Sequence, residues 1–249
     1  LRLVGSEMCI RDREDVEALQ VPDVYECERT LDRIKGVELF RKKLGTPFPI
    51  IGWIEGPLAE AADLSGISEL LMNMIIEPDM VKALQQKCLQ MAKSFALAQI
   101  KAGANIIGVG DAVCSQISQE MYDGFCLSLH KELFDFIHEH GALVKLHICG
   151  NITHILHSLK KTDIDILDVD WMVDMAEAHK IMGEDVMLCG NLDPVSVIMS
   201  GTKELIKKKY EEVKVSIPRA NWIMMGGCEI PRDTPIENMK YLRELSMKY

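Results

Sequence analysis

Short apolar segments alternate with amphipathic helical segments along almost the whole chain, and this alternation constrains the fold most strongly. The apolar segments that are candidate strands lie at residues 49–54, 105–110, 143–148, 166–169, 186–189 and 222–225. Most are continuous apolar runs, which are typical of parallel strands covered on both faces. Strands that alternate with helices in this way predict a parallel sheet with right-handed crossovers.

Such a sheet is either open and doubly wound or closed into a barrel. No glycine-rich dinucleotide-binding motif follows an early strand. Polar and thiol residues instead collect just after the strands, at Glu55, Asp111, His147, Cys149, Asp170, Asn191 and Cys228. In a barrel these strand ends converge on one mouth, where active sites lie. We therefore predict an α/β fold of the (β/α)8 barrel type, from which N-terminal strands are missing because only six are recognisable.

The first thirteen residues, LRLVGSEMCIRDR, follow no clear hydrophobic period and do not lead into the next segment. They resemble translated sequencing-adapter sequence, so we treat residues 1–13 as a non-native tail and leave them out of the fold prediction. We expect the natural part of this sequence to begin near Glu14. We also expect the natural protein to have further N-terminal residues that this sequence lacks. Residues 14–249 are then predicted to form a single, incomplete barrel domain.

Composition excludes several classes of protein. The formal net charge is -10, whereas proteins that bind nucleic acids present basic patches to the phosphate backbone. No apolar run approaches the roughly 20 residues of a membrane-spanning helix, and no signal-peptide pattern is present. The eight cysteines are scattered, several of them inside apolar segments. We therefore expect a cytoplasmic protein whose thiols are free or bound to metal.

A histidine and a cysteine lie two residues apart at the end of the third predicted strand. Side chains alternate between the faces of a strand, so His147 and Cys149 project to the same side. An imidazole and a thiolate together suit zinc. Cys228, in the loop after the last predicted strand, is the expected third ligand at the same mouth. Two cysteines and one histidine leave a fourth position open, which is the pattern of a catalytic zinc.

The alternative is that these residues are buried side chains without a metal, which is the commoner explanation for a single histidine or cysteine. Because His147 and Cys149 are two residues apart at a strand end, the local sequence supports a metal site and metal-free burial about equally. Cys189, at a neighbouring strand end, is a weaker candidate for this site. The remaining cysteines considered, Cys27, Cys88, Cys114 and Cys126, are expected to be packing residues.

Several motifs resemble the uroporphyrinogen decarboxylase superfamily. They are residues 168–171 (DVDW), 189–194 (CGNLDP), 226–235 (GGCEIPRDTP) and 52–57 (GWIEGP). The resemblance runs from about residue 20 to the end of the chain, and the asparagine–aspartate–proline motif is its most specific part. It implies a (β/α)8 barrel, in agreement with the alternation of strands and helices.

Two departures from the decarboxylase pattern separate the branches of this superfamily. The decarboxylases carry Gly-His-Gly where this chain has Gly-Cys-Glu at residues 227–229, and a lysine–glycine segment where it has His-Ile-Cys-Gly at 147–150. Both changes resemble the corrinoid-dependent methyltransferases, such as the methylcobamide:coenzyme M enzymes. The resemblance implies zinc on His147, Cys149 and Cys228, a methylated corrinoid on a separate corrinoid protein as donor, and a small thiol as acceptor.

Further residues are predicted to act at the same mouth. Asp170 is predicted to be a labile fourth ligand or to orient His147, with a helix cap as the alternative. Glu55 and Asp111 are predicted to bind or deprotonate the acceptor, with solvated loop carboxylates as the alternative. Asn191 and Trp171 are assigned to cofactor binding, although Asn191 also suits a turn and Trp171 also suits core packing.

Two other functions remain open at this point. A porphyrinogen decarboxylase needs no metal, and that family uses an arginine-bearing N-terminal segment that is not found in this sequence. A non-catalytic barrel that binds corrinoid or zinc would carry the ligands without transferring a methyl group. Metal content distinguishes the first from a zinc methyltransferase, and a methyl-transfer assay distinguishes the second.

Overall fold

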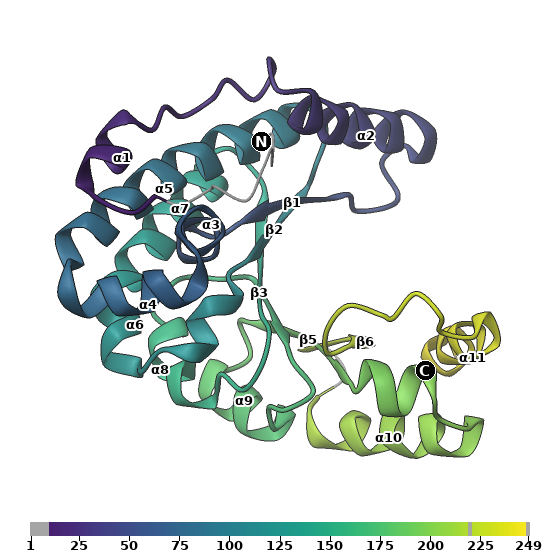
Figure 1. The fold of residues 1–249 in the computed structure, drawn as a ribbon. Helices are drawn as coiled ribbons and strands as arrows, with labels where there is room; N and C mark the ends of the chain where they lie inside the picture. Colours follow the sequence, from purple (N-terminus) through teal and green to yellow (C-terminus); the bar gives the residue numbers. More distant parts are fainter. Residues whose placement is uncertain (1–9, 219–220, 248–249) are drawn as a thin grey trace.

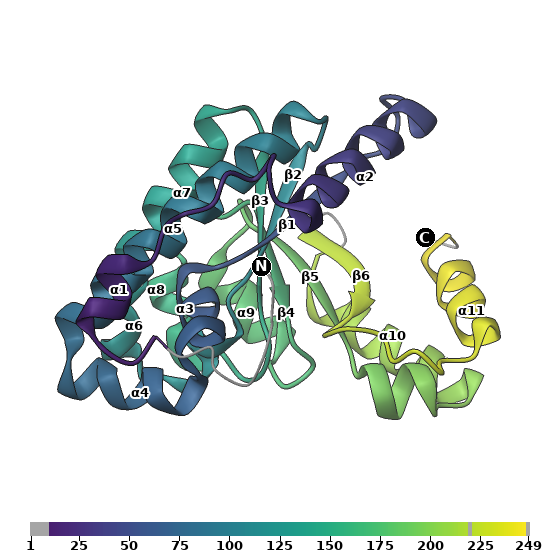
Figure 2. The same ribbon diagram turned by 45° about the horizontal axis from the view of Figure 1, so that its top comes forward.

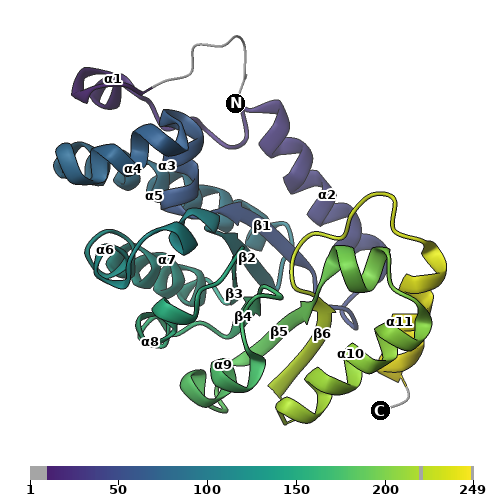
Figure 3. The same cartoon turned by 60° about the horizontal axis from the view of Figure 1, so that its bottom comes forward.

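The computed structural model describes residues 10–218 and 221–247, and in this part of the chain six strands form one parallel sheet. The strands are β1 (Ile51–Glu55), β2 (Ile106–Gly110), β3 (Leu143–Ile148), β4 (Ile166–Val169), β5 (Met187–Leu192) and β6 (Trp222–Gly226). Each strand pairs with the next one in the sequence, so the spatial order equals the chain order (Figure 3). The sheet is open, because β1 and β6 form its two edges.

Helices connect the strands. They are α1 (Arg13–Ala18), α2 (Glu28–Leu44), α3 (Pro57–Ser65), α4 (Ile67–Ile76), α5 (Pro78–Lys101), η1 (Ala112–Gln116), α6 (Gln119–Phe125), α7 (Leu127–Glu139), η2 (Thr153–Ile155), α8 (Leu156–Leu159), α9 (Met175–Met182), η3 (Pro194–Met199), α10 (Lys203–Ser216) and α11 (Ile236–Met247). Figure 1 shows α3 to α9 on one side of the sheet, with α2 and α11 beyond its two ends. This is the arrangement of a barrel with part of its wall open.

The helix-covered face of the sheet holds the main core. Alternate strand residues such as Ile54, Val109, Leu146 and Val169 are buried there against α3, α5 and α7. The opposite face carries the residues between them, including the polar ones. Because side chains alternate along each strand, the same segments build the apolar core and present chemistry on the other face.

The exposed edge of β1 is covered at one point by a side chain. The Gln99 amide on α5 accepts a hydrogen bond from the Trp53 backbone N–H and donates one to the Trp53 carbonyl, both at 3.0 Å. A Cβ at Gly52 would lie 2.8 Å from Gln99 Oε1, so only glycine leaves room for this contact. Gln99 thus makes the two hydrogen bonds that a neighbouring strand would make at Trp53.

A second, smaller core holds the C-terminal helices against the last two strands. Ile206, Tyr210 and Leu242 are buried together on α10 and α11, and Trp222 of β6 packs beside them. Figure 2 shows α10 beside β5 and β6, with α11 beyond it. This packing fixes the end of β6, from which the loop with Cys228 begins.

The sequence prediction of a partly open α/β barrel with six parallel strands is confirmed. Several strand bounds differ from the prediction by one to three residues. Two of these differences affect candidate site residues: β1 extends to Glu55, and β5 extends through Asn191 to Leu192. Both residues therefore lie within strands rather than after them. No helix in the described part of the chain combines the length and the apolar character needed to cross a membrane. The predicted tail falls mostly on residues 1–9, which lie outside the described residues.

Candidate metal centre

His147, Cys149 and Cys228 come together at the carboxyl end of the sheet. His147 Nε2 lies 3.1 Å from Cys149 Sγ, and Cys149 Sγ lies 3.4 Å from Cys228 Sγ. The ligand atoms of all three residues lie within 4.8 Å of one another, and each residue is half-buried. A site of this kind is shielded by protein on one side and open to an incoming molecule on the other.

Local backbone structure brings the three residues together. His147 is inside β3, and the strand ends before Cys149, where Gly150 has a φ of +90° that turns the chain away. Cys228 follows Gly227 directly after β6. A Cβ at Gly227 would overlap the Trp171 backbone nitrogen and lie 3.0 Å from the Asp170 carbonyl carbon. Glycine at this position therefore lets the Cys228 loop lie directly on the loop after β4.

The spacing of the three ligand atoms fits a zinc ion. Tetrahedral zinc with bonds of about 2.3 Å to sulfur and about 2.0 Å to nitrogen separates two sulfurs by roughly 3.8 Å and a sulfur and a nitrogen by roughly 3.6 Å. The gaps of 3.4 Å and 3.1 Å would widen by only about 0.4 Å and about 0.5 Å to reach these values. Soft sulfur with imidazole is also the donor set that zinc prefers.

Mutual contact shifts the ionisation of these groups. Hydrogen bonding to His147 lowers the pKa of the Cys149 thiol, against the opposing effect of its burial. Burial raises the pKa of the Cys228 thiol. Burial opposes the charged form of His147, but hydrogen bonds with Asp168 and Cys149 outweigh it and raise its pKa to about 11. The thiolate of Cys149, one of the forms that metal binding needs, is therefore already favoured.

Asp168, which was not assigned to the site from the sequence, lies on the far side of the His147 ring. Its main-chain oxygen is 3.3 Å from His147 Nδ1, and its carboxylate Oδ2 is 3.5 Å from the same atom. Lys145 Nζ contacts that Oδ2 as an ion pair. His147 thus directs Nε2 to the two cysteines and Nδ1 to Asp168.

Asp170 holds loop backbone and caps no helix, because the N-cap of the following helix, α9, is Asp174. Its Oδ2 accepts a hydrogen bond from the Gly150 N–H at 2.8 Å, and its Oδ1 accepts one from the Met172 N–H at 3.2 Å. It is not part of the group of ligand atoms formed by the histidine and the two cysteines. The residue beside His147 is Asp168 instead, because the strand register pairs these two residues.

Asn191 and Trp171 lie around the loop after β4. The Asn191 side-chain amide is buried and donates hydrogen bonds to the carbonyls of Asp170, at 3.2 Å, and Val173, at 2.7 Å. This geometry matches the turn-forming role that the sequence also allowed. Trp171 is 46% exposed, so its ring is available to a ligand. The thiol of Cys189 is buried against Met225 Sδ at 2.8 Å and lies outside the ligand group.

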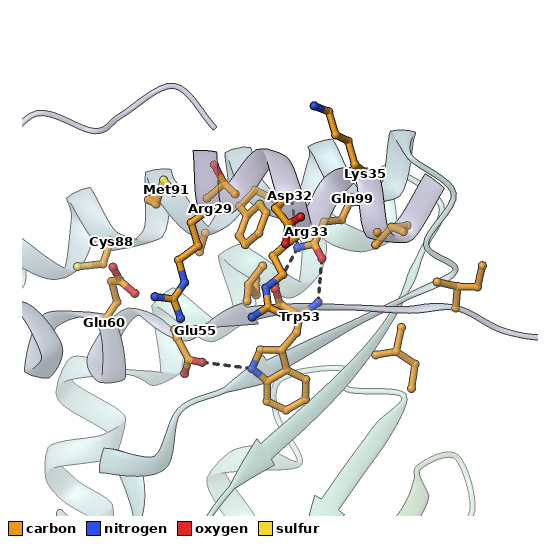
Figure 4. A pocket seen from close by; sticks show the side chains of 18 of the residues that line it. Arg29, Asp32, Arg33, Lys35, Trp53, Glu55, Glu60, Cys88, Met91 and Gln99 are labelled. Carbon is orange, nitrogen blue, oxygen red and sulfur yellow. Dashed lines mark hydrogen bonds between the residues drawn. The ribbon is translucent and has the colours of Figure 1, made fainter. Parts of the chain in front are cut away.

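Glu55 lies on the same face of the sheet as His147. The register places Gly110 of β2 between them, so the two residues are two strands apart, or about 10 Å. Glu55 Oε1 accepts a hydrogen bond from Trp53 Nε1 at 3.2 Å (Figure 4). Burial raises the pKa of the Glu55 carboxyl. A pocket of about 960 Å³ is lined by Trp53 and Glu55 and extends along the edge of β1 toward Arg29 and Arg33 on α2.

Asp111 does not point at the mouth as predicted. It is buried on the helix-covered side, where Oδ1 accepts a hydrogen bond from the Ala59 N–H at 2.8 Å and Oδ2 lies 2.9 Å from His130 Nε2. His130 Nδ1 is 2.8 Å from the Tyr122 hydroxyl. Asp111 follows Gly110, which faces the other way, so strand alternation carries its side chain to the opposite face.

This buried network has a structural role. The N-terminus of α3 has no side-chain cap of its own at Gly56, and Asp111 provides one from another part of the chain. A Cβ at Gly56 would lie 2.6 Å from Asp111 Cβ, which explains the glycine before Pro57. Asp111, Cys114 and His130 also bring possible ligand atoms within 4.8 Å of one another. The carboxylate is already satisfied by hydrogen bonds, so the cluster holds together without an ion.

An Asp111→Ala variant is expected to lose stability but keep the metal centre. Removing the carboxylate leaves the first turn of α3 uncapped and the buried Nε2 of His130 without its partner, so the free energy of unfolding should fall by about 3 kcal/mol. Urea denaturation and metal analysis of the same samples measure the two properties. Asp123→Ala, at an exposed position on α6, is the control and should change neither. Loss of metal from the folded Asp111 variant would contradict this separation.

Comparison with known proteins places these observations in a family. The family model for uroporphyrinogen decarboxylase (URO-D) matches residues 6–249, so the match begins inside the predicted tail. The methylcobamide:CoM methyltransferase MtbA of Methanosarcina mazei is 30% identical over 218 residues, covering 87% of this chain and 63% of that protein. The uroporphyrinogen decarboxylase of Carboxydothermus hydrogenoformans is 28% identical over 219 residues, covering 85% of this chain and 62% of that protein.

Among solved structures, a methyltransferase from Methanosarcina mazei superposes with a TM-score of 0.86 at 24% sequence identity, covering 94% of this chain and 68% of that one. This likeness supports the fold. The chain spans less than two thirds of the length of the two relatives above. The sequence motifs, the parallel sheet and the family match agree, and the chain belongs to the uroporphyrinogen decarboxylase (URO-D) family.

Proposed function

We propose that this protein is a zinc-dependent methyltransferase that moves a methyl group from a methylated corrinoid, carried by a corrinoid protein, to a thiol such as coenzyme M. The observation that carries the proposal is the meeting of His147, Cys149 and Cys228 at the open end of the sheet. A decarboxylase of the same family would have no use for three soft ligands at this point. A relative named as a methylcobamide:CoM methyltransferase supports the same branch.

The residues of this chain would prepare the acceptor. A zinc ion held by His147, Cys149 and Cys228 would lower the pKa of the acceptor thiol and hold its thiolate near the open face. Glu55, whose carboxyl pKa is raised by burial, is the candidate to receive the thiol proton. Transfer would form a carbon–sulfur bond to the acceptor as the carbon–cobalt bond of the methylated donor breaks, with the electron pair of that bond leaving on the corrinoid. The product is a thioether.

The surroundings of the site suit this reaction. The ligand residues are half-buried and face the uncovered side of the sheet, where a flat corrinoid can approach. Trp171, an exposed aromatic residue at this end of the sheet, is the candidate to contact the corrinoid. All seven cysteines in the described part of the chain are free thiols, which is consistent with a protein of the reducing cytoplasm.

Purified protein should contain about one zinc per chain and should demethylate methylcobalamin when a thiol is added. Metal analysis and the absorbance change of the corrinoid measure the two properties, with coenzyme M, homocysteine and no thiol as parallel samples. Removal of zinc by a chelator should stop the reaction, and added zinc should restore it. Zinc without methyl transfer would indicate a binding barrel, whereas a folded, metal-free protein that decarboxylates uroporphyrinogen would indicate the decarboxylase.

A further inference from the structure

A buried ion pair lies beside the three ligand residues, on the uncovered face of the sheet. Lys145 is two residues before His147 on β3, so the two side chains share a face. On β4 the register pairs His147 with Asp168 and Lys145 with Ile166, so Asp168 lies one diagonal position from Lys145. Lys145 Nζ contacts Asp168 Oδ2, and the two side chains are only 8% and 4% exposed. Lys145 also lies over the Trp53 ring, 5.8 Å from its centroid.

Stability does not account for this pair. Taking two charges out of water costs about as much as their attraction returns, and apolar residues of similar size often stabilise a protein equally well. The carboxylate is also incompletely satisfied, because Asp168 Oδ1 is buried and has no hydrogen-bond partner. A buried carboxylate oxygen without a partner is uncommon and costly. The pair therefore calls for a role beyond holding β3 and β4 together.

The neighbouring imidazole of His147 indicates what that role is. His147 Nε2 faces the cysteines, while Nδ1 lies 3.3 Å from the main-chain oxygen of Asp168 and 3.5 Å from its carboxylate. Histidines that bind metals commonly donate their second ring N–H to a carboxylate or carbonyl, which fixes the tautomer and the ring orientation. Asp168 offers both acceptors on the side of the ring away from the cysteines.

We propose that Asp168, held in place by Lys145, is the positioning residue of the metal centre. It keeps the proton of His147 on Nδ1 and leaves Nε2 free for the metal. The positive charge of Lys145 cancels the negative charge of Asp168. The charges of a divalent ion, the two cysteine thiolates, Asp168 and Lys145 therefore sum to zero before the acceptor thiolate binds. The inference rests on the proposed function in so far as that function requires the metal.

Two variants separate this role from a purely structural one. Asp168→Asn keeps the size of the side chain and removes its charge, and Lys145→Met/Asp168→Asn also removes the lysine that would otherwise be left unpaired. Zinc affinity is measured by competition with a chromogenic chelator, the absorption spectrum is recorded after substitution with Co²⁺, and urea unfolding of the metal-free proteins reports stability. Lys93→Met/Glu132→Gln removes an ion pair of 2.7 Å on the helical surface and is the matched control.

We expect both Asp168 variants to bind zinc about 10- to 100-fold more weakly and to show altered Co²⁺ bands, even where the double variant unfolds like the wild type. The control pair should match the wild type in metal affinity and spectrum. A double variant that binds zinc as tightly as the wild type would overturn the inference, because the main-chain carbonyl would then be sufficient. Wild-type protein that binds zinc without transferring methyl groups would refute the proposed function and leave this test intact.

Discussion

A Cys149→Ser variant is expected to lose its zinc and its methyl transfer to thiols. Cys149 is the central ligand, with His147 Nε2 at 3.1 Å and Cys228 Sγ at 3.4 Å. A serine hydroxyl is a poor zinc ligand, because it stays protonated near neutral pH and lacks the soft sulfur. Mutating a residue that hydrogen-bonds to a metal ligand typically lowers metal affinity or activity by about 10- to 100-fold. Loss of a direct ligand should have a larger effect, so zinc affinity and the rate of methyl transfer should both fall by more than about 100-fold. Metal analysis and the methylcobalamin assay measure the two effects.

The matched control for this prediction is Cys27→Ser. Cys27 is a half-buried thiol at the N-terminus of α2, where it makes no side-chain capping hydrogen bond. Serine is a better capping residue than cysteine, so this variant should fold at least as well as the wild type and keep about one zinc per chain. A Cys149 variant that retains zinc at the level of the Cys27 variant would rule out the proposed metal centre.

A Gly227→Ala variant is expected to disrupt the metal centre through a single methyl group. The new Cβ would overlap the backbone nitrogen of Trp171, and backbone atoms cannot rotate away as a side-chain end can. The loop that carries Cys228 must therefore move off the loop after β4, which separates Cys228 from Cys149. Zinc affinity should fall at least about 10-fold, and overpacking should lower the free energy of unfolding by about 2 kcal/mol. Chelator competition and urea unfolding measure these changes.

The comparison for this variant is the same substitution where space is available. Gly36 lies within α2, and a Cβ there would meet no heavy atom within 4 Å. Alanine should raise stability at this helix position by about 0.5 to 1 kcal/mol and leave zinc binding unchanged. Equal zinc affinity of the two alanine variants would show that contact between the two loops does not position Cys228.

The sequence predicted the sheet and the ligand set because both depend on local patterns. Continuous apolar runs indicate buried parallel strands, and the strands predicted from them match the structure to within a few residues. The spacing of His147 and Cys149 fixes their common face once the strand is known. Cys228, 79 positions from Cys149, was predicted from its place after the last strand, because strand ends of a barrel converge on one mouth, and the family resemblance implied the same ligand.

The neighbours of the ligands were harder to predict because they depend on strand register. Asp168 was counted as a strand residue and Asp170 was assigned to His147, yet the register pairs His147 with Asp168. A signal was present in both strands: Lys145 and Asp168 are charged residues inside apolar runs, where an unpaired charge is costly. A lysine two residues before a predicted ligand could have indicated a second charged residue on the next strand.

Asp111 illustrates a different limit. The run before it is apolar on both faces, so no polar–apolar alternation showed which way its side chain turns. His130 on α7 pairs with Asp111, and Tyr122 on α6 pairs with His130. Nothing in the sequence linked these two helices to a strand end. Only the three-dimensional packing shows that this carboxylate caps α3 from a distance.

The positions of the ligands in the chain should also affect how fast the C-terminal half of the sheet opens. An ion held at the end of β3 and by the loop after β6 would tie together segments 79 residues apart. It would enclose β4, β5, β6 and the helices between them in one loop. Opening of that half of the sheet would then require release of the ion or breakage of the tie. Bound zinc should therefore slow proteolysis of the C-terminal half far more than that of α1 and α2, which lie outside the enclosed loop.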